Sequence, residues 1–119
     1  MKVNQLIVNV TSDNPARLST FYRDTVGLPS MPDMGEYAMK AGETPFLIDG
    51  HSGIHGAAKE PARVLMSLMV DDLKSEQARL EAAGVSFIRT EGKEPWGGVI
   101  STFTDPDGNY MQLIEFKGE

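Results

Sequence analysis

Residues 94–116 read EPWGGVISTFTDPDGNYMQLIEF, a pattern of two strands joined by a tight turn. Val99–Thr104 and Tyr110–Phe116 are rich in the β-branched and aromatic residues that favour strands. Between them, Asp105–Asn109 combines Asp, Pro, Gly and Asn, and its Asp-Gly pair supplies the positive-φ geometry that a tight hairpin needs. We therefore expect an antiparallel hairpin at this end of the sequence.

A strand, a helix and another strand are predicted before this hairpin. Arg63–Val70 is a strand-like run that is apolar almost throughout, and Asp71 and Asp72 follow it as helix-capping residues. Gly84 ends the helix, and Val85–Thr90 alternates as the next strand. The buried side of the helix is expected to hold Leu73, Gln77, Leu80 and Ala83. The second half of the sequence thus has the order β-α-β-β-β.

The first half of the sequence has the same order of elements. Val3–Val10 alternates as a strand, Asn14 is the expected N-cap of a helix over Pro15–Val26, and Gly27 ends that helix. The strand is expected to turn Leu6, Val8 and Val10 toward the helix. Three further short strands are expected at Pro29–Asp33, Glu36–Ala41 and Thr44–Asp49.

This repeat of topology predicts one α+β domain over residues 1–119, made of two βαβββ modules. The first module spans about residues 1–51, residues 52–62 form a loop rich in small residues, and the second module spans about residues 63–119. One module alone would leave a sheet face bare. We therefore expect two curved sheets around a shared cleft, contributed by one chain or by two chains together.

The composition excludes several classes of protein. The 119 residues include no cysteine, which removes disulfides and thiolate chemistry, and 40% of them are hydrophobic, as in a globular core. The formal net charge of −6, with no basic cluster, argues against nucleic-acid and membrane-surface binding. No apolar run reaches the ~20 residues of a membrane span, and no signal peptide is evident, so a cytoplasmic protein is expected.

Three stretches resemble the vicinal oxygen chelate superfamily, which includes glyoxalase I, extradiol dioxygenases and bleomycin-resistance proteins. They are FYRDTVGLP at residues 21–29, VDDL with LEAAGV at residues 70–85, and the quoted residues 94–116. The resemblance covers nearly the whole chain. It implies the glyoxalase/bleomycin resistance fold, with two βαβββ modules around a ligand cleft, and a homodimer as the state in solution.

The resemblance also implies positions for a metal ion, which metal-dependent members hold with His, Gln and Glu side chains from four strands. These positions fall on Gln5, on Leu65, on Leu47 or Ile48, and on Gln112, where the family usually has Glu. Divalent transition metals prefer imidazole and carboxylate donors, and Leu offers no lone pair. We therefore predict no metal site and no cofactor, and metal-dependent chemistry becomes the less favoured alternative.

Two histidines, His51 and His55, lie four residues apart where the predicted loop begins, with Asp49 close by. The glycines around them argue against a helix that would bring both rings to one face. We interpret them as solvated or capping groups. A weak metal site at these three residues is the alternative.

The alternation along the strands predicts which side chains line the cleft. The expected ligand-binding residues are Gln5, Ile7, Asn9, Tyr37, Met39, Phe46, Ile48, Leu65, Ser67, Met69, Trp96, Thr102, Tyr110 and Gln112. The set is mostly apolar and aromatic with a few neutral hydrogen-bonding groups, as in many small-molecule sites. The alternative for the methionines is a place in the core.

Three functions follow from these observations. The favoured one is a metal-free protein that binds a small apolar or aromatic molecule, of the sequestration or resistance type. The alternative is a metal-dependent lyase, isomerase or dioxygenase of the same superfamily, so the sequence leaves catalysis undecided. The third is an accessory domain whose cleft is filled by its own side chains.

Overall fold

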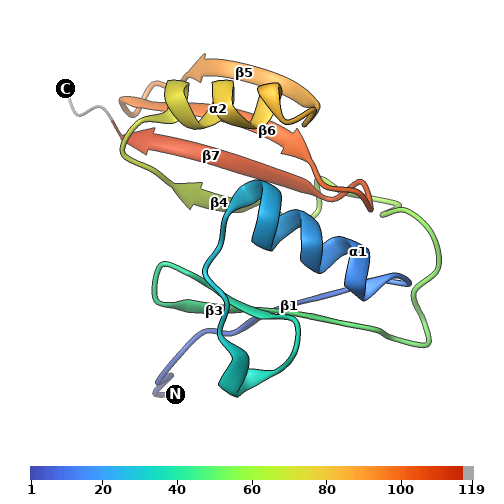
Figure 1. Cartoon of the computed structure of the whole chain (residues 1–119). Helices are drawn as coiled ribbons and strands as arrows, with labels where there is room; N and C mark the ends of the chain where they lie inside the picture. The colour runs from blue at the N-terminus through green and yellow to red at the C-terminus, as the bar shows by residue number, and fades with distance from the viewer. Residues whose placement is uncertain (117–119) are drawn as a thin grey trace. The chain divides into compact units, whose positions relative to one another are not determined.

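The computed structural model describes residues 1–116 and contains two compact units, which divide between Gly56 and Ala57 (Figure 1). One unit contains a three-stranded sheet and the other a four-stranded sheet, each with a helical segment. The predicted α+β class is confirmed. None of the helices in residues 1–116 is long and apolar enough to cross a membrane.

The first unit is built on a sheet with the strand order β1-β3-β2. The strands are β1 (Val8–Thr11), β2 (Ala38–Ala41) and β3 (Thr44–Asp49). β2 and β3 form an antiparallel hairpin, whereas β1 pairs with β3 in parallel. Parallel neighbours need a long crossover connection, and the helical segment between β1 and β2 lies in that connection.

This helical segment covers the span predicted from the sequence. α1 (Pro15–Thr20) begins with Asn14, whose side-chain oxygen accepts the backbone N–H of Arg17 at 3.2 Å. The segment continues as a π-helix, η1 (Phe21–Val26), and ends at Gly27, which has a φ of 93°. The predicted cap, helical span and terminating glycine are confirmed, while the π-helical second half was not predicted.

Two strand predictions in this unit need correction. The first strand is β1, which starts at Val8 rather than Val3, so residues 3–7 lie before it. The strand expected at Pro29–Asp33 is wrong: Ser30 makes one isolated bridge to Met39, and the short 3-10 helix η2 (Pro32–Met34) follows. Proline has no N–H to donate to a ladder, which explains why this stretch does not form a strand.

The second unit has a four-stranded sheet with the order β4-β7-β6-β5. β4 pairs with β7 in parallel, and the other pairs are antiparallel. The elements are β4 (Met66–Met69), α2 (Leu73–Ala82), β5 (Phe87–Lys93), β6 (Gly98–Thr104) and β7 (Tyr110–Phe116). The predicted hairpin of residues 99–116 is confirmed as β6 and β7.

α2 covers one face of this sheet through the buried side chains of Leu73, Gln77 and Leu80. Ser101 of β6 points toward the helix, because its hydroxyl donates to Oε1 of Gln77. Ala83 is exposed instead of buried, since it is the C-cap residue after the last helical turn. The other three predicted contacts of this helix are confirmed.

The N-cap of α2 gives a first testable prediction. The Asp72 carboxylate accepts the backbone N–H of Ser75 at 3.1 Å. We expect Asp72→Ala to lower the free energy of unfolding by about 1 kcal/mol, because a helix N–H loses its acceptor. The neighbouring exposed Asp71 is the matched control, and Asp71→Ala should change stability by less than about 0.5 kcal/mol. Urea denaturation measures both variants, and equal losses would contradict the capping role.

Candidate functional site

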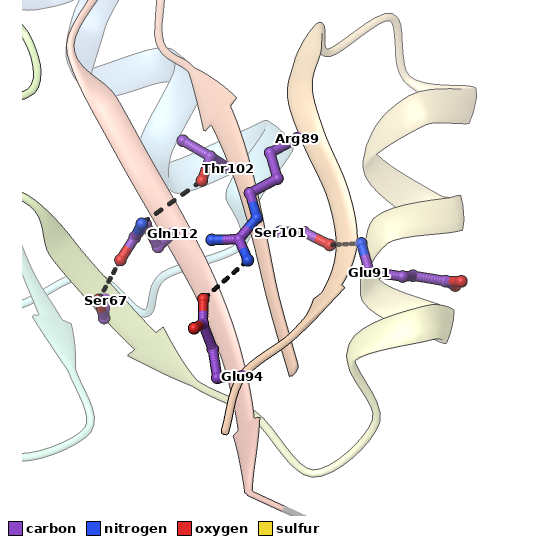
Figure 2. A network of polar contacts seen from close by, with 7 residues as sticks. All are labelled: Ser67, Arg89, Glu91, Glu94, Ser101, Thr102 and Gln112. Atoms are coloured by element: carbon purple, nitrogen blue, oxygen red, sulfur yellow. Dashed lines mark hydrogen bonds and ion pairs between the residues drawn. The ribbon is translucent and has the colours of Figure 1, made fainter. Parts of the chain in front are cut away.

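The side of the four-stranded sheet opposite α2, here called the distal face, carries a row of polar side chains. Since Ser101 points at α2, the next residue on β6, Thr102, points to the distal face. In the strand register Ser67 lies beside Gln112, Gln112 beside Thr102, and Thr102 beside Arg89. These four residues form what we call the polar row (Figure 2).

Gln112 joins the row into a hydrogen-bonded chain. Ser67 Oγ donates to Gln112 Oε1 at 3.0 Å, and Gln112 Nε2 donates to Thr102 Oγ1 at 3.5 Å (Figure 2). The two bonds fix the orientation of the amide. An amide has two donor hydrogens and two acceptor lone pairs, so these bonds use only part of its capacity. The part of the row formed by Ser67, Gln112 and Thr102 is therefore suited to hydrogen-bond an uncharged polar group of a ligand.

An apolar and aromatic surface lies beside the polar row. Two residues further along the strands, the exposed Met69 and the buried Ile100 flank Ile114 in the sheet. Beyond them the rings of Trp96 and Phe116 are stacked, with an interplanar angle of 6° and centroids 6.3 Å apart. These two rings are 50% and 58% exposed, respectively. Large exposed apolar side chains next to fixed polar groups are typical of a binding surface.

Gly98 allows the indole of Trp96 to lie where it does. A Cβ atom at position 98 would overlap Cζ3 and Cη2 of the indole ring. The ring is therefore laid directly over the first residue of β6, and it meets Phe116 because Gly98 pairs with Phe116 in the sheet. This close approach is a reason for glycine at position 98.

The structure brings together six of the residues predicted to line the cleft. On the distal face or at its end lie Ser67, Met69, Trp96, Thr102, Tyr110 and Gln112. Leu65 directly precedes β4 and is exposed. For the strand residues among them the alternation was correctly inferred, while the role of all six in binding stays a prediction.

Three residues of the first unit that were predicted to line the cleft lie instead on the side of their sheet that faces the helical segment. The ring of Phe46 contacts Tyr22 of η1, with centroids 4.9 Å apart, so it faces the helical segment. Ile48 shares this side by alternation along β3, and Met39 shares it as the cross-strand partner of Phe46. All three are buried in the core. Their assignment to the cleft is therefore corrected.

The remaining predicted residues of the first unit are more accessible. Gln5 and Ile7 are exposed and precede β1, and Asn9 is exposed within β1. Tyr37 is half-buried just before β2. The charge of the neighbouring Glu36 raises the pKa of the Tyr37 phenol.

Sequence reasoning missed several residues of the distal face, namely Arg89, Glu94, Ile100, Ile114 and Phe116. Ile114 and Phe116 share the alternation of Gln112, so that signal was present in the sequence. Arg89 could not be placed by alternation, because the register of β5 shifts on both sides of it.

The residues present do not fit the divalent ion that the resemblance implies. Gln112 is a neutral amide already held between two hydroxyls, and Leu65 has no donor atom. Within residues 1–116 no group of three or more His, Asp or Glu side chains is placed to hold a metal. His51 Nδ1 accepts the backbone N–H of Gly53 at 2.9 Å, which confirms a capping role for this histidine.

Comparisons with known proteins agree with this fold. The family model described as Glyoxalase/Bleomycin resistance protein/Dioxygenase superfamily matches residues 3–113. A search of the curated proteins finds no match.

Among solved structures, TnmS3, an antibiotic binding protein from Streptomyces sp. CB03234, has 24% sequence identity and a TM-score of 0.72, over 98% of each chain. A lactoylglutathione lyase from Agrobacterium tumefaciens has 22% identity and a TM-score of 0.70, over 92% of this chain and 91% of that chain. A glyoxalase/bleomycin resistance protein/dioxygenase family enzyme from Burkholderia phytofirmans PsJN has 16% identity and a TM-score of 0.74, over 92% and 96%. At these identities the likeness concerns the fold.

Proposed function

This chain belongs to the Glyoxalase/Bleomycin resistance protein/Dioxygenase superfamily, and we propose that it binds a small apolar or aromatic molecule without a metal ion. The observation that carries the proposal is the distal face, where the polar row lies beside the stacked rings of Trp96 and Phe116. A flat ligand would stack on the exposed rings and accept or donate hydrogen bonds at the row. Antibiotic binding by the structurally similar TnmS3 supports the same class of function.

The chemistry of position 112 supports the metal-free part of the proposal. The resemblance places an acidic metal ligand there, but Gln112 is neutral and bridges Ser67 and Thr102. A divalent ion would have to break this chain of hydrogen bonds and would gain no negative charge in return. The Gln112 amide is better suited to hydrogen-bond a small organic molecule than to coordinate a metal ion.

A metal-dependent lyase, isomerase or dioxygenase is the second candidate, favoured by the likeness to a lactoylglutathione lyase. Metal analysis of the purified protein separates the two. We expect less than about 0.1 equivalent of Mn, Fe, Ni or Zn after dialysis, because no three donor side chains of residues 1–116 are placed to hold an ion. Stoichiometric metal that survives dialysis would support the enzyme instead.

Binding of the neutral dye 1-aminoanthracene tests the proposed function directly. We expect its fluorescence to rise on addition of wild-type protein, and Trp96→Ala to weaken the binding about tenfold through loss of the stacking surface. Trp96 is the only tryptophan in the sequence, so quenching of its emission provides a second measurement. Arg79→Gln is the control, because Arg79 lies on α2.

The dye experiment has two outcomes that would contradict the proposal. One is the absence of any dye binding by the folded wild-type protein. The other is equal binding by wild type and Trp96→Ala, which would place the dye elsewhere. Circular dichroism of each variant establishes that it is folded.

We also propose that two copies associate, which is the state implied by the resemblance. Sedimentation velocity at micromolar concentration measures this property, and a monomer would contradict it. The binding proposal does not depend on the result, because its residues all belong to the second unit.

A further inference from the structure

Arg89 is the one cation of the polar row, and its side chain lies flat across the sheet. A Cβ atom at Gly92 would overlap Nε, Nη2 and Cζ of the guanidinium, so the group lies directly over the Gly92 backbone. Its Nη2 donates to Glu94 Oε1 at 2.7 Å (Figure 2). The two side chains are 42% and 23% exposed, so the guanidinium remains accessible to a ligand.

A shift in register brings Arg89 to the distal face. Phe87 pairs with Phe103, and Arg89 pairs with Thr102, so two steps along β5 correspond to one step along β6. Without the shift Arg89 would lie on the same side as Phe87, whose ring contacts Phe103 on the α2 side. A bulge of this kind re-aims a side chain.

A second shift follows Arg89 and includes a strained residue. Three steps from Arg89 to Gly92 correspond to two steps along β6. Within them Glu91 has a φ of 44°, which is uncommon for a residue other than glycine. Its backbone N–H donates to Ser101 Oγ at 3.0 Å, which holds the irregular backbone in place. Arg89 is thus flanked by two departures from regular strand geometry.

A contribution to the folding stability of the protein does not explain this arrangement of Arg89. Ion pairs as exposed as Arg89–Glu94 contribute little to folding, whereas bulges interrupt the ladder and a left-handed residue is strained. Strained backbone that re-aims a charged side chain is commonly found at binding sites. The observations therefore favour a role for the guanidinium in ligand recognition.

We propose that Arg89 binds the anionic group of the ligand, and that this group is a carboxylate or a similar oxyanion on a flat apolar molecule. The inference rests on the proposed function and names the class of its ligand. The guanidinium lies over Gly92 and the indole over Gly98, which are about 8 Å apart from strand geometry. That spacing is comparable to the length of a two-ring aromatic acid. Glu94 holds the guanidinium in position when no anion is bound.

The competing explanation is that the Arg89–Glu94 ion pair has only a structural role. The turn after β5 contains Glu94 and Trp96, and Gly97 N–H donates to the Glu94 carbonyl at 3.1 Å. In this explanation the Arg89–Glu94 pair would only hold the turn and the indole in place. Loss of the pair would then weaken the binding of neutral and anionic ligands equally. This expectation distinguishes the two explanations experimentally.

The test uses 2-naphthoate and 2-naphthamide as competitors of bound 1-aminoanthracene. The two compounds share ring system and size but differ in charge. We expect wild-type protein to bind naphthoate about tenfold more tightly than naphthamide, because a guanidinium–carboxylate pair is charge-assisted and can be bidentate. Arg89→Gln should bring the ratio of naphthoate to naphthamide affinity to about one, and Arg89→Lys should keep only part of the preference, since lysine lacks the planar fork.

Glu94→Gln should bind naphthoate about two- to fivefold more tightly than wild type, because the guanidinium loses its competing partner. Arg79→Gln, which breaks the similarly exposed Arg79–Glu76 pair on α2, is the matched control and should leave the preference unchanged. Equal competition by both compounds, with the dye bound, would overturn the inference and leave the proposed function standing. Failure of the wild-type protein to bind the dye would overturn the proposed function and the inference with it.

Discussion

Replacement of Phe103 by Ala is expected to lower the free energy of unfolding by about 4 kcal/mol, because a large side chain is removed from a closed core. Phe103 is 0% exposed and packs against Phe87, with ring centroids 5.5 Å apart. Its cross-strand partner Met111 is also fully buried. Since small domains are stabilised by only about 5–15 kcal/mol, this single change would remove a large part of the total.

Phe116→Ala is the matched control for this prediction. Phe116 lies on the neighbouring strand β7 but is exposed, so its loss should cost about 0.5–1 kcal/mol. Urea denaturation followed by far-ultraviolet circular dichroism compares the variants at unchanged m-value. Similar losses for Phe103→Ala and Phe116→Ala would show that the α2 side of the sheet is not the core of this unit.

The second half of the fold could be predicted well because its local signals agree. The turn residues Asp105–Asn109 and the alternation of Tyr110–Phe116 are strong in themselves, and Asp72 and Gly84 mark the ends of the helix. In the first half, a short strand was expected at Pro29–Asp33 despite its prolines, and the structure has a single bridge and a 3-10 helix there instead. Residue propensities predicted an element correctly where the helix caps, the turn residues and the spacing of apolar residues all indicated the same element.

Only those parts of the site that follow from the alternation of side chains along the strands could be predicted. Alternation separates the two faces of a strand but does not say which face meets a helix. For Phe46 and Ile48 that choice depends on the parallel register with Val8 and Val10, which the sequence does not reveal. For Arg89 even the alternation failed, because bulges change which side chains share a face. The residue most informative about the ligand was therefore the one least accessible to sequence reasoning.

These features divide the second unit into two differently built sides. The α2 side is closed by Phe103, Met111 and Leu113, which are almost fully buried. The distal face instead uses register shifts, a glycine beneath the indole and a bridged amide to arrange its polar side chains and its exposed rings. Variants of the buried residues on the first side should change unfolding, and variants of the exposed rings Trp96 and Phe116 on the second should change binding with little change in unfolding.

The turn between β6 and β7 depends on one buried carboxylate. Asp105 Oδ1 accepts the backbone N–H groups of Asp107 and Asn109, and Oδ2 accepts Nδ2 of Asn109, each at 2.9 Å. The backbone also closes here, since Gly108 N–H donates to the Asp105 carbonyl at 2.9 Å and Gly108 has a φ of 82°. One side chain thus satisfies three donors in the loop that joins the two central strands.

Asp105→Ala is therefore expected to lower the free energy of unfolding by about 3 kcal/mol, because buried N–H donors lose a charged acceptor. Asp105→Asn should cost about half as much, since an amide oxygen can replace one acceptor while its NH2 group faces another donor. Pro106→Ala, at an exposed position of the same turn, should cost less than about 1 kcal/mol. Chemical denaturation of the three variants measures this order, and a loss for Asp105→Ala no larger than that for Pro106→Ala would contradict it.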